Sequence, residues 1–150
     1  MTEGQTALAG WRRVLDILDI DPDVADPEDG VALPEGPIGI RFDHVAFRYP
    51  KPGETAAEAS GPTVLHDVDL EIAPQTRVAI VGETGSGKTT FAKLLTRLMD
   101  PAGGRVLIDD LPVDRIRFDS LRRRVVMVPQ EGALFAGTVA DNLRHGKPDA

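Results

Sequence analysis

The stretch Gly82–Thr89 reads GETGSGKT and fits the pattern G-x-x-x-x-G-K-T/S, in which a glycine-rich loop wraps around phosphate groups. Its glycines permit backbone angles and close approaches that turn successive N–H groups toward an anion. Lys88 can reach the outer phosphates of a nucleotide, and the Thr89 hydroxyl can ligate Mg²⁺. The pattern therefore makes a nucleoside triphosphate the first ligand to consider.

The segments that flank this loop are typical of a strand before it and a helix after it. Arg77–Val81, RVAIV, is short, apolar and β-branched, as in a buried strand of a parallel sheet. Thr89–Met99 has apolar residues at helical spacing and is closed by Asp100 and Pro101. Those apolar residues are Phe91, Leu94, Leu95 and Leu98. A glycine-rich turn that only caps a helix is the alternative, and the flanking pattern favours a phosphate loop.

Composition limits the classes of protein to which the chain can belong. Its 150 residues are 41% hydrophobic, which suffices for one domain with a core. The net charge is −7, and nine acidic but only two basic residues precede position 38, whereas the remainder is balanced. Because the sequence lacks a basic footprint, it argues against a protein that coats DNA or RNA. The absence of cysteine excludes disulfides and thiolate metal sites and fits a reducing, cytosolic setting. The histidines, at His44, His66 and His145, have no metal-ligand spacing.

The N-terminal quarter of the chain differs from the rest. A helix is predicted from about Thr6 to Leu18, with one apolar face that needs a partner. That face comprises Leu8, Trp11, Leu15 and Leu18. Asp21–Pro37 is rich in Pro, Asp, Glu and Gly and is predicted to be an extended linker rather than a packed element, so a domain is expected to begin near Ile38. No apolar run approaches the roughly 18 residues of a membrane span, and any membrane contact is expected to be indirect.

Two strands are predicted between this linker and the phosphate loop. Ile38–Tyr49 alternates as a strand with an irregularity near His44, and Pro50 ends it. Lys51–Pro62 is small and polar and is predicted to be an exposed loop. Val64–Ile72 then resumes the alternation of a strand.

Four short elements are predicted after the helix that follows the loop. Two are strands, of which the second is expected to be buried and to end at Pro129. The other two are a helical turn or two and the beginning of a helix. In chain order they are Arg105–Asp109, Asp119–Arg124, Val125–Val128 and Thr138–Arg144, of which the first and third are the strands.

Gln130 and Tyr49 are candidate site residues outside the loop. Gln130 follows the predicted strand Val125–Val128, 42 positions after Lys88, so a doubly wound sheet would bring it to the edge that carries the loop. There it could contact Mg²⁺ or the attacking water, and the alternative is a solvated loop residue. Tyr49 lies at a strand end, where its ring could stack on adenine or only cover the edge of the core.

The stretch Val106–Asp110, VLIDD, has the form of an apolar strand followed by an aspartate that supports Mg²⁺. The glycines before it and the Leu-Pro pair after it favour a hairpin strand that ends in an acidic turn. In the alternative, a small-molecule kinase of another P-loop class, Asp109 would serve Mg²⁺. Substitution of Asp109 by Asn would separate the two interpretations.

Four stretches together resemble the nucleotide-binding domain of ATP-binding cassette (ABC) transporters. They are FRYP at Phe47–Pro50, GETGSGKTT at Gly82–Thr90, GGRVLIDDLPV at Gly103–Val113 and VPQEGALFAGTVADNL at Val128–Leu143. The LFAGTVADNL tail, and the LAGWRRVLDILD helix with the acidic linker after it, resemble exporters that join membrane and ATPase domains in one chain. The resemblance covers about residues 8–148. It implies an α/β fold of the P-loop NTPase class, ABC type, with a mixed sheet around the Walker A helix.

The resemblance also implies roles for individual residues. Tyr49 matches the aromatic residue that stacks on adenine, and Gln130 matches the glutamine that senses Mg²⁺ and faces the coupling helix of the membrane domain. Lys88 and Gln130 would be catalytic, while Thr89 and Gln130 would bind the metal. The loop residues that would bind ATP are Gly82, Glu83, Thr84, Gly85, Ser86, Gly87, Lys88, Thr89 and Thr90.

By the same resemblance, residues 1–37 are a helix and linker from a membrane domain, and residues 38–150 are the N-terminal portion of a nucleotide-binding domain. The implied partners are a second such domain and the membrane domain of a transporter, at the cytoplasmic face of the cell membrane, with no nucleic acid. The signature motif, the acidic Walker B strand and the switch histidine of the family are not found in this sequence. The chain alone is therefore expected to bind ATP weakly or not at all and to show no appreciable ATPase activity. An ABC ATPase that acts without a transporter is the remaining alternative, and the N-terminal helix weighs against it.

Overall fold

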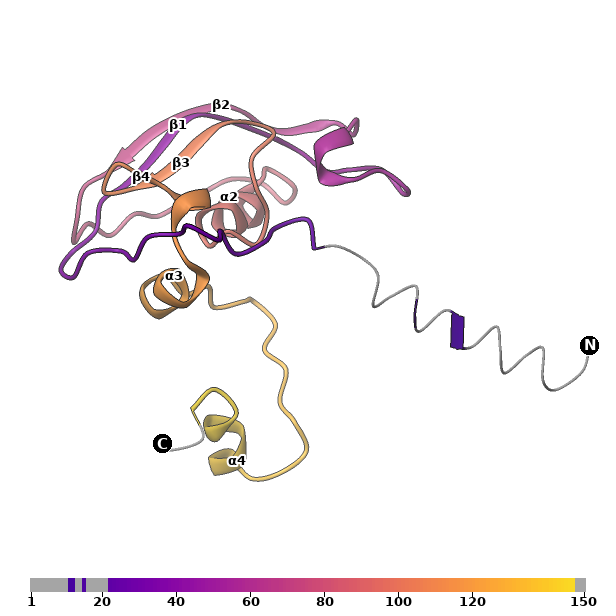
Figure 1. Ribbon diagram of the computed structural model, residues 1–150, viewed down its shortest axis with the longest axis vertical. Helices are drawn as coiled ribbons and strands as arrows, with labels where there is room; N and C mark the ends of the chain where they lie inside the picture. Colours follow the sequence, from indigo (N-terminus) through magenta and orange to yellow (C-terminus); the bar gives the residue numbers. More distant parts are fainter. Residues whose placement is uncertain (1–10, 13–14, 16–21, 148–150) are drawn as a thin grey trace, which may run out of the picture.

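The computed structural model describes residues 11–12, 15 and 22–147 (Figure 1). Most of the predicted helix Thr6–Leu18 lies outside the described residues; within it Trp11, Arg12 and Leu15 are helical and exposed. No helix in the described part of the chain is long and apolar enough to cross a membrane.

A four-stranded antiparallel sheet forms the upper layer in Figure 1. The alternation of apolar and polar residues predicted its three longer strands, and their bounds are confirmed to within two residues. A short fourth strand completes a hairpin with the third. In chain order the strands are β1 Ile40–Arg48, β2 Thr63–Ile72, β3 Gly103–Ile108 and β4 Leu111–Pro112, and their order in the sheet is β2-β1-β3-β4.

The predicted irregularity near His44 is confirmed, and it explains how β1 fills the core. His44 has a φ of 52°, and the pairing of β1 with β2 shifts register between Phe42 and Val45. In a regular strand these two side chains would point to opposite faces because they are three residues apart. The extra residue in the bulge places both against the core, where each is 0% exposed.

The bulge of β1 faces a second irregularity in β2, where Asp67 has a φ of 46°. His44 Nδ1 lies 2.7 Å from Asp67 Oδ1. This hydrogen bond and the charge of Asp67, with smaller contributions from Asp69 and Asp43, raise the pKa of His44 above its ordinary value of 6.5. The bond therefore stabilises the fold fully below pH about 6.5 and stops doing so as the pH rises through the higher folded pKa.

We expect Asp67→Asn to lower the pKa of His44 in the folded protein toward 6.5, because the charge and the charge-assisted bond are both lost. Asn tolerates the left-handed backbone at this position, so the bulge is retained. An NMR titration of the histidine rings measures the shift. Asp114→Asn, an exposed acid on another element, is the control. An unchanged His44 titration in Asp67→Asn would contradict the assignment.

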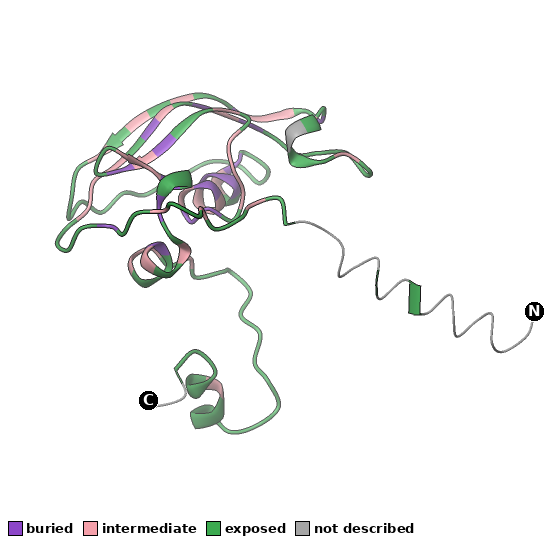
Figure 2. Cartoon of the chain, in the orientation of Figure 1, coloured by how far each residue is buried: buried purple, intermediate pink, exposed green. Residues whose placement is uncertain are grey.

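One helix packs under the sheet, and the remaining helices are short (Figures 1 and 2). Phe42 of β1 stacks on Phe91 with ring centroids 4.0 Å apart and an interplanar angle of 14°, which joins the sheet to α2. The predicted loop 51–62 is largely exposed and carries one helical turn, η1. The helices are η1 Ala56–Glu58, α2 Lys88–Leu95, η2 Val113–Arg115, α3 Phe118–Arg124 and α4 Val139–Arg144. The core consists of Leu33, Phe42, Val45, Phe47, Leu65, Phe91, Leu94, Val106, Ile108, Val113, Ile116 and Leu121.

Helix α2 is shorter than the predicted span 89–99. Arg97, with a φ of 50°, ends it: its N–H donates to the carbonyl of Leu94, and the N–H of Leu98 donates to the carbonyl of Lys93. These two bonds form a Schellman cap in which an arginine takes the place that glycine usually occupies. Leu98 consequently lies beyond the helix and is 49% exposed, so its predicted place on the apolar face is wrong.

The two predicted buried strands, Arg77–Val81 and Val125–Val128, are not strands in this structure. Val81 is 88% exposed and Val128 is 87% exposed. A buried parallel strand needs hydrogen-bonded neighbours and helices on both faces, and the described residues supply neither to these segments. The predictions were wrong because an apolar run indicates burial without naming the partner that provides it.

The acidic segment Asp26–Gly36, called the docked segment below, lies along η2 and α3 (Figure 1). The N–H of Val31 donates to the carbonyl of Arg115 at 2.8 Å, and the N–H of Arg117 donates to the carbonyl of Val31 at 3.0 Å. Val31 and Ile116 thus form an isolated parallel bridge. The segment is extended at Val31, but it turns at Pro27–Gly30, where the N–H of Gly30 donates to the carbonyl of Pro27, and its backbone is tied to a distant part of the chain.

Side chains fix the docked segment to α3. Asp26 Oδ1 accepts a bond of 2.8 Å from the N–H of Phe118, which caps the first turn of a helix whose own N-cap residue supplies no side-chain bond. The N–H of Leu33 donates to Ser120 Oγ at 2.9 Å, and the Leu33 side chain is buried at 7% exposure.

Arg124, the last residue of α3, completes this attachment. Its guanidinium donates to the carbonyl oxygens of Pro34, at 2.7 Å, and Gly36. The prediction that Asp21–Pro37 is not a packed element is therefore wrong for the docked segment. Proline, aspartate and glycine content disfavours regular structure, but it does not prevent an extended chain from packing along a helix.

Candidate functional site

The phosphate-loop sequence folds into a tight turn directly before α2. Gly85 and Gly87 have φ values of 85° and 91°, in the left-handed region that favours glycine. Gly87 is also buried: a Cβ atom there would lie 2.7 Å from Leu65 Cδ2 and 3.3 Å from the carbonyl oxygen of Val64. The loop therefore needs a glycine at position 87 for two reasons, its backbone angle and its contact with β2.

The first half of the loop closes on the second. The N–H of Ser86 donates to the carbonyl of Glu83 at 3.2 Å. A Cβ atom on Gly82 would lie 2.6 Å from Ser86 Oγ and 3.3 Å from Ser86 Cβ, so a larger residue at position 82 would require the Ser86 side chain to move. A tight glycine-rich turn directly before a helix is the kind of backbone that can bind a phosphate group.

Lys88 is held at the loop by neutral acceptors. Its Nζ donates to the carbonyl oxygens of Gly82, at 2.8 Å, and Glu83, at 2.7 Å, and lies 3.4 Å from Ser86 Oγ. Within residues 22–147, Lys88 forms no ion pair. Its positive charge is therefore placed at the loop and is not neutralised by a carboxylate, as a site for a polyanion requires.

The two threonines after Lys88 differ in their surroundings. Thr89 is exposed, so its hydroxyl is accessible to a metal ion. Thr90 is only 4% exposed, and its Oγ1 lies 3.0 Å from the hydroxyl of Tyr49. The structure therefore brings Tyr49 to the loop helix. No sequence pattern indicated this contact, because the two residues are 41 positions apart.

Tyr49 itself lies just beyond the end of β1. Its ring meets the ring of Phe47 edge to face, with centroids 4.9 Å apart and an interplanar angle of 87°. Tyr49 is 38% exposed. An apolar hollow of about 210 Å³ adjoins it and is lined in part by Phe47, Leu98 and Met99. An aromatic ring that is held on one side and accessible on another is suited to stacking.

Gln130 is not joined to these residues. It is exposed, it follows the segment that did not form the predicted strand, and in the described range 22–147 its side chain makes no hydrogen bond. Among the described residues there is therefore no parallel sheet that would bring Gln130 to the loop. Its role stays a prediction.

Asp109 is confirmed as part of a hairpin turn. Asp109 and Asp110 have φ values of 48° and 63°, as in a two-residue type I′ turn, and Ile108 pairs with Leu111 across it. Asp109 Oδ1 accepts a bond of 2.6 Å from the N–H of Gly39. The carboxylate thus has a structural partner, which weighs against the kinase alternative. No group of three or more His, Cys, Asp or Glu side chains in the described part of the chain could hold a metal ion.

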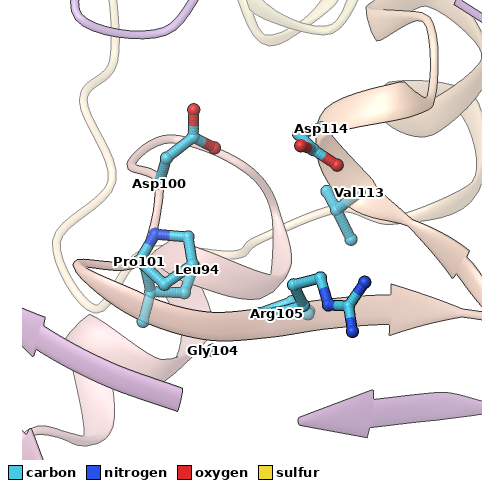
Figure 3. Close-up of a pocket in the computed structure, with 8 residues that line it drawn as sticks. Leu94, Asp100, Pro101, Gly104, Arg105, Val113 and Asp114 are labelled. Atoms are coloured by element: carbon cyan, nitrogen blue, oxygen red, sulfur yellow. The ribbon is translucent and has the colours of Figure 1, made fainter. Parts of the chain in front are cut away.

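A second hollow, of about 190 Å³, lies between the end of α2, β3 and η2 (Figure 3). Asp100, Arg105 and Asp114 are its charged lining residues. It shares no lining residue with the phosphate loop, so we do not count it as part of the candidate site.

Comparison with known proteins gives a consistent result. The ABC transporter family matches residues 65–150. The chain is 38% identical over 146 residues to the fatty acid ABC transporter ATP-binding/permease protein of Mycobacterium bovis. This alignment covers 97% of this chain and 21% of that protein. It is also 40% identical over 145 residues to the ATP-dependent lipid A-core flippase of Alkalilimnicola ehrlichii. That alignment covers 96% of this chain and 23% of that protein.

A solved structure has the same fold. The structure of a bacterial Atm1-family ABC exporter with ATP bound matches this chain with a TM-score of 0.78 and 34% identity, over 95% of this chain and 24% of that chain. The chain thus spans about a fifth to a quarter of the length of the proteins it matches. It belongs to the ABC transporter family, and its fold is that of the ATP-binding domain of an ABC exporter.

Proposed function

We propose that the chain binds Mg-ATP at the loop Gly82–Thr90 and forms part of the domain that couples ATP hydrolysis to export. The observation that carries this proposal is the placement of Lys88, whose ammonium group is fixed at a glycine cradle by neutral oxygens only. A charge held in this way can stabilise the negative charge that develops when the terminal phosphate is transferred to water.

The other residues of the site have complementary roles in this proposal. Backbone N–H groups of the loop and the start of α2 would hold the phosphates, and the exposed hydroxyl of Thr89 would ligate the metal. Mg²⁺, when bound, would neutralise phosphate charge. Gln130 would contact the metal or the attacking water, and Tyr49 would stack on adenine. These assignments agree with the exposure of Thr89, Gln130 and Tyr49.

The names of the relatives support a membrane setting. The M. bovis protein is called an ATP-binding/permease protein, and the A. ehrlichii protein is called a flippase. We propose that this chain likewise works with a membrane domain and with a second nucleotide-binding domain, at the cytoplasmic face of the membrane. Residues 1–37 would connect it to the membrane domain, and residues 38–150 would belong to the nucleotide-binding domain.

The chain alone is not proposed to sustain hydrolysis. The signature motif and the acidic Walker B segment that the family uses are not found in its sequence. We expect weak, Lys88-dependent binding of Mg-ATP and no steady release of phosphate.

The test is a titration of the 150-residue chain with Mg-ATP, followed by NMR, for the wild type and Lys88→Ala. Loss of a charge-assisted contact is worth about 1.5–3 kcal/mol, so we expect affinity to fall about tenfold or more. Lys93→Ala, on the last turn of the same helix, is the matched control, and Asp109→Asn tests the kinase alternative; both are expected to bind as the wild type does.

Two outcomes would contradict the proposal. Equal affinities of wild type and Lys88→Ala would show that the loop is not the nucleotide site. Phosphate release by the chain above the level of Lys88→Ala would show that this chain completes the reaction by itself.

A further inference from the structure

We propose that Thr90 is a positioning residue, whose side-chain hydroxyl holds the ring of Tyr49 at a fixed place relative to the phosphate loop. Thr90 Oγ1 lies 3.0 Å from the Tyr49 hydroxyl. Thr90 stands two residues after Lys88 in the first turn of α2, whereas Tyr49 follows β1. The bond therefore links the element that carries the phosphate loop to the element that carries the aromatic ring.

The ring of Tyr49 is held at two points. Phe47, which is 6% exposed and belongs to the core, meets it edge to face at 4.9 Å, and Thr90 binds its hydroxyl. A tyrosine side chain has two χ angles, so two fixed points determine the plane of its ring. Without the second point, rotation about the first χ angle would move the ring away from the loop.

A second buried threonine, Thr96 at the end of the same helix, satisfies its hydroxyl locally. Thr96 is 7% exposed, and its Oγ1 donates to the carbonyl oxygens of Ala92, at 3.0 Å, and Lys93, at 3.2 Å. This return to the preceding turn is the usual way in which a helical threonine satisfies its hydroxyl. Thr90 instead reaches a residue 41 positions away, so its hydroxyl contributes a tertiary contact.

This inference rests on the proposed function, since it assigns Tyr49 to the nucleobase and the loop to the phosphates. If both groups bind one ligand, the distance between ring and loop determines how well base and phosphates are bound together. Loss of the bond between Thr90 and Tyr49 should then weaken the binding of a nucleotide more than the binding of phosphates alone.

The experiment compares Thr90→Val, Tyr49→Phe and the double variant with the wild type. Valine replaces the hydroxyl of threonine with a methyl group of similar size and phenylalanine keeps the ring of tyrosine, so each change removes the hydrogen bond with little change of shape. Mg-ATP and Mg-tripolyphosphate, which has no base, are titrated in the 150-residue chain, and Thr96→Val is the matched control. We expect each single variant to bind ATP about 3- to 10-fold more weakly, the double variant to be no weaker than the singles, and Tyr49→Phe to leave tripolyphosphate binding unchanged.

A nucleotide-free measurement accompanies the titrations. Tyr49 is the only tyrosine of the chain, so its ring resonances report on this side chain alone. We expect them to shift in Thr90→Val and to remain in place in Thr96→Val. This measurement decides the inference even if the 150-residue chain binds ATP too weakly to be titrated, an outcome that bears on the proposed function alone.

Three results would overturn the inference. In the first, Thr90→Val weakens the binding of ATP and of tripolyphosphate equally while Tyr49→Phe has no effect, which would mean that Thr90 contacts the phosphates directly. In the second, the double variant loses ATP affinity by a factor equal to the product of the two single-variant factors. The third is an unshifted Tyr49 signal in Thr90→Val.

Discussion

Gly104→Ala is expected to lower the free energy of unfolding by about 3 kcal/mol or more, a large share of the roughly 5–15 kcal/mol that stabilises a whole domain. Gly104 has a φ of 75°, and a Cβ atom on it would overlap the backbone carbonyls of Asp43 and His44. These two residues form the bulge of β1, whose backbone is anchored by the buried side chains on either side of it. The sheet therefore cannot move aside without disturbing its own core.

Gly53→Ala separates the collision from the strain of the backbone angle. Gly53 has a φ of 88°, similar to that of Gly104, but no atom lies within 4 Å of the position a Cβ would take. We expect the free energy of unfolding of this control to fall by only about 1–2 kcal/mol, the cost of a left-handed backbone angle. Urea unfolding of both variants, followed by circular dichroism, measures the difference. Equal losses would mean that the close approach of β3 to the bulge does not exist in solution.

Phe42→Ala is expected to lower the free energy of unfolding by about 3–5 kcal/mol, the range for removing a buried aromatic side chain. Phe42 is 0% exposed and stacks on Phe91, so the substitution removes the contact that joins β1 to α2. A cavity would remain between sheet and helix, because the backbone of β1 is paired on both sides and cannot collapse into it. Nucleotide binding should weaken along with stability, since α2 carries Lys88 at its first turn.

Phe135→Ala is the control for this prediction. Phe135 is 62% exposed, and its ring contacts only the ring of His145 among the aromatic residues described. We expect the midpoint of thermal unfolding to change by far less than in Phe42→Ala. Similar shifts in the two variants would show that the layer between β1 and α2 is not the core of the fold.

Sequence reasoning predicted the parts of this fold that depend on local pattern. Alternation located β1, β2 and β3, and the position of His44 marked the bulge before any pairing was known. The glycines of the phosphate loop indicated its turn, because left-handed backbone angles limit which residues can occupy it. Each of these features is determined by residues that are neighbours in the sequence.

Features that depend on distant partners were missed or misread. Arg77–Val81 and Val125–Val128 have the composition of buried strands, but the described residues offer no strand to pair with either. The bond between Tyr49 and Thr90 leaves no periodic signal, because it joins a strand end to a helix face. The attachment of the docked segment was missed for the same reason. Composition alone cannot show that an acidic, proline-rich stretch has carbonyl groups at the spacing that Arg124 binds.

The docked segment also determines the order in which this fold can be completed during synthesis. Asp26 and Phe118 are 92 positions apart, so the first partner leaves the ribosome long before the second has been made. The hairpin of β1 and β2 needs a far shorter stretch of chain, and closing it costs less conformational entropy. The docked segment is therefore made before β1 and β2 but reaches its place after them. Until α3 has been translated, the aspartates and prolines of the docked segment keep this unpaired piece of chain hydrated and soluble.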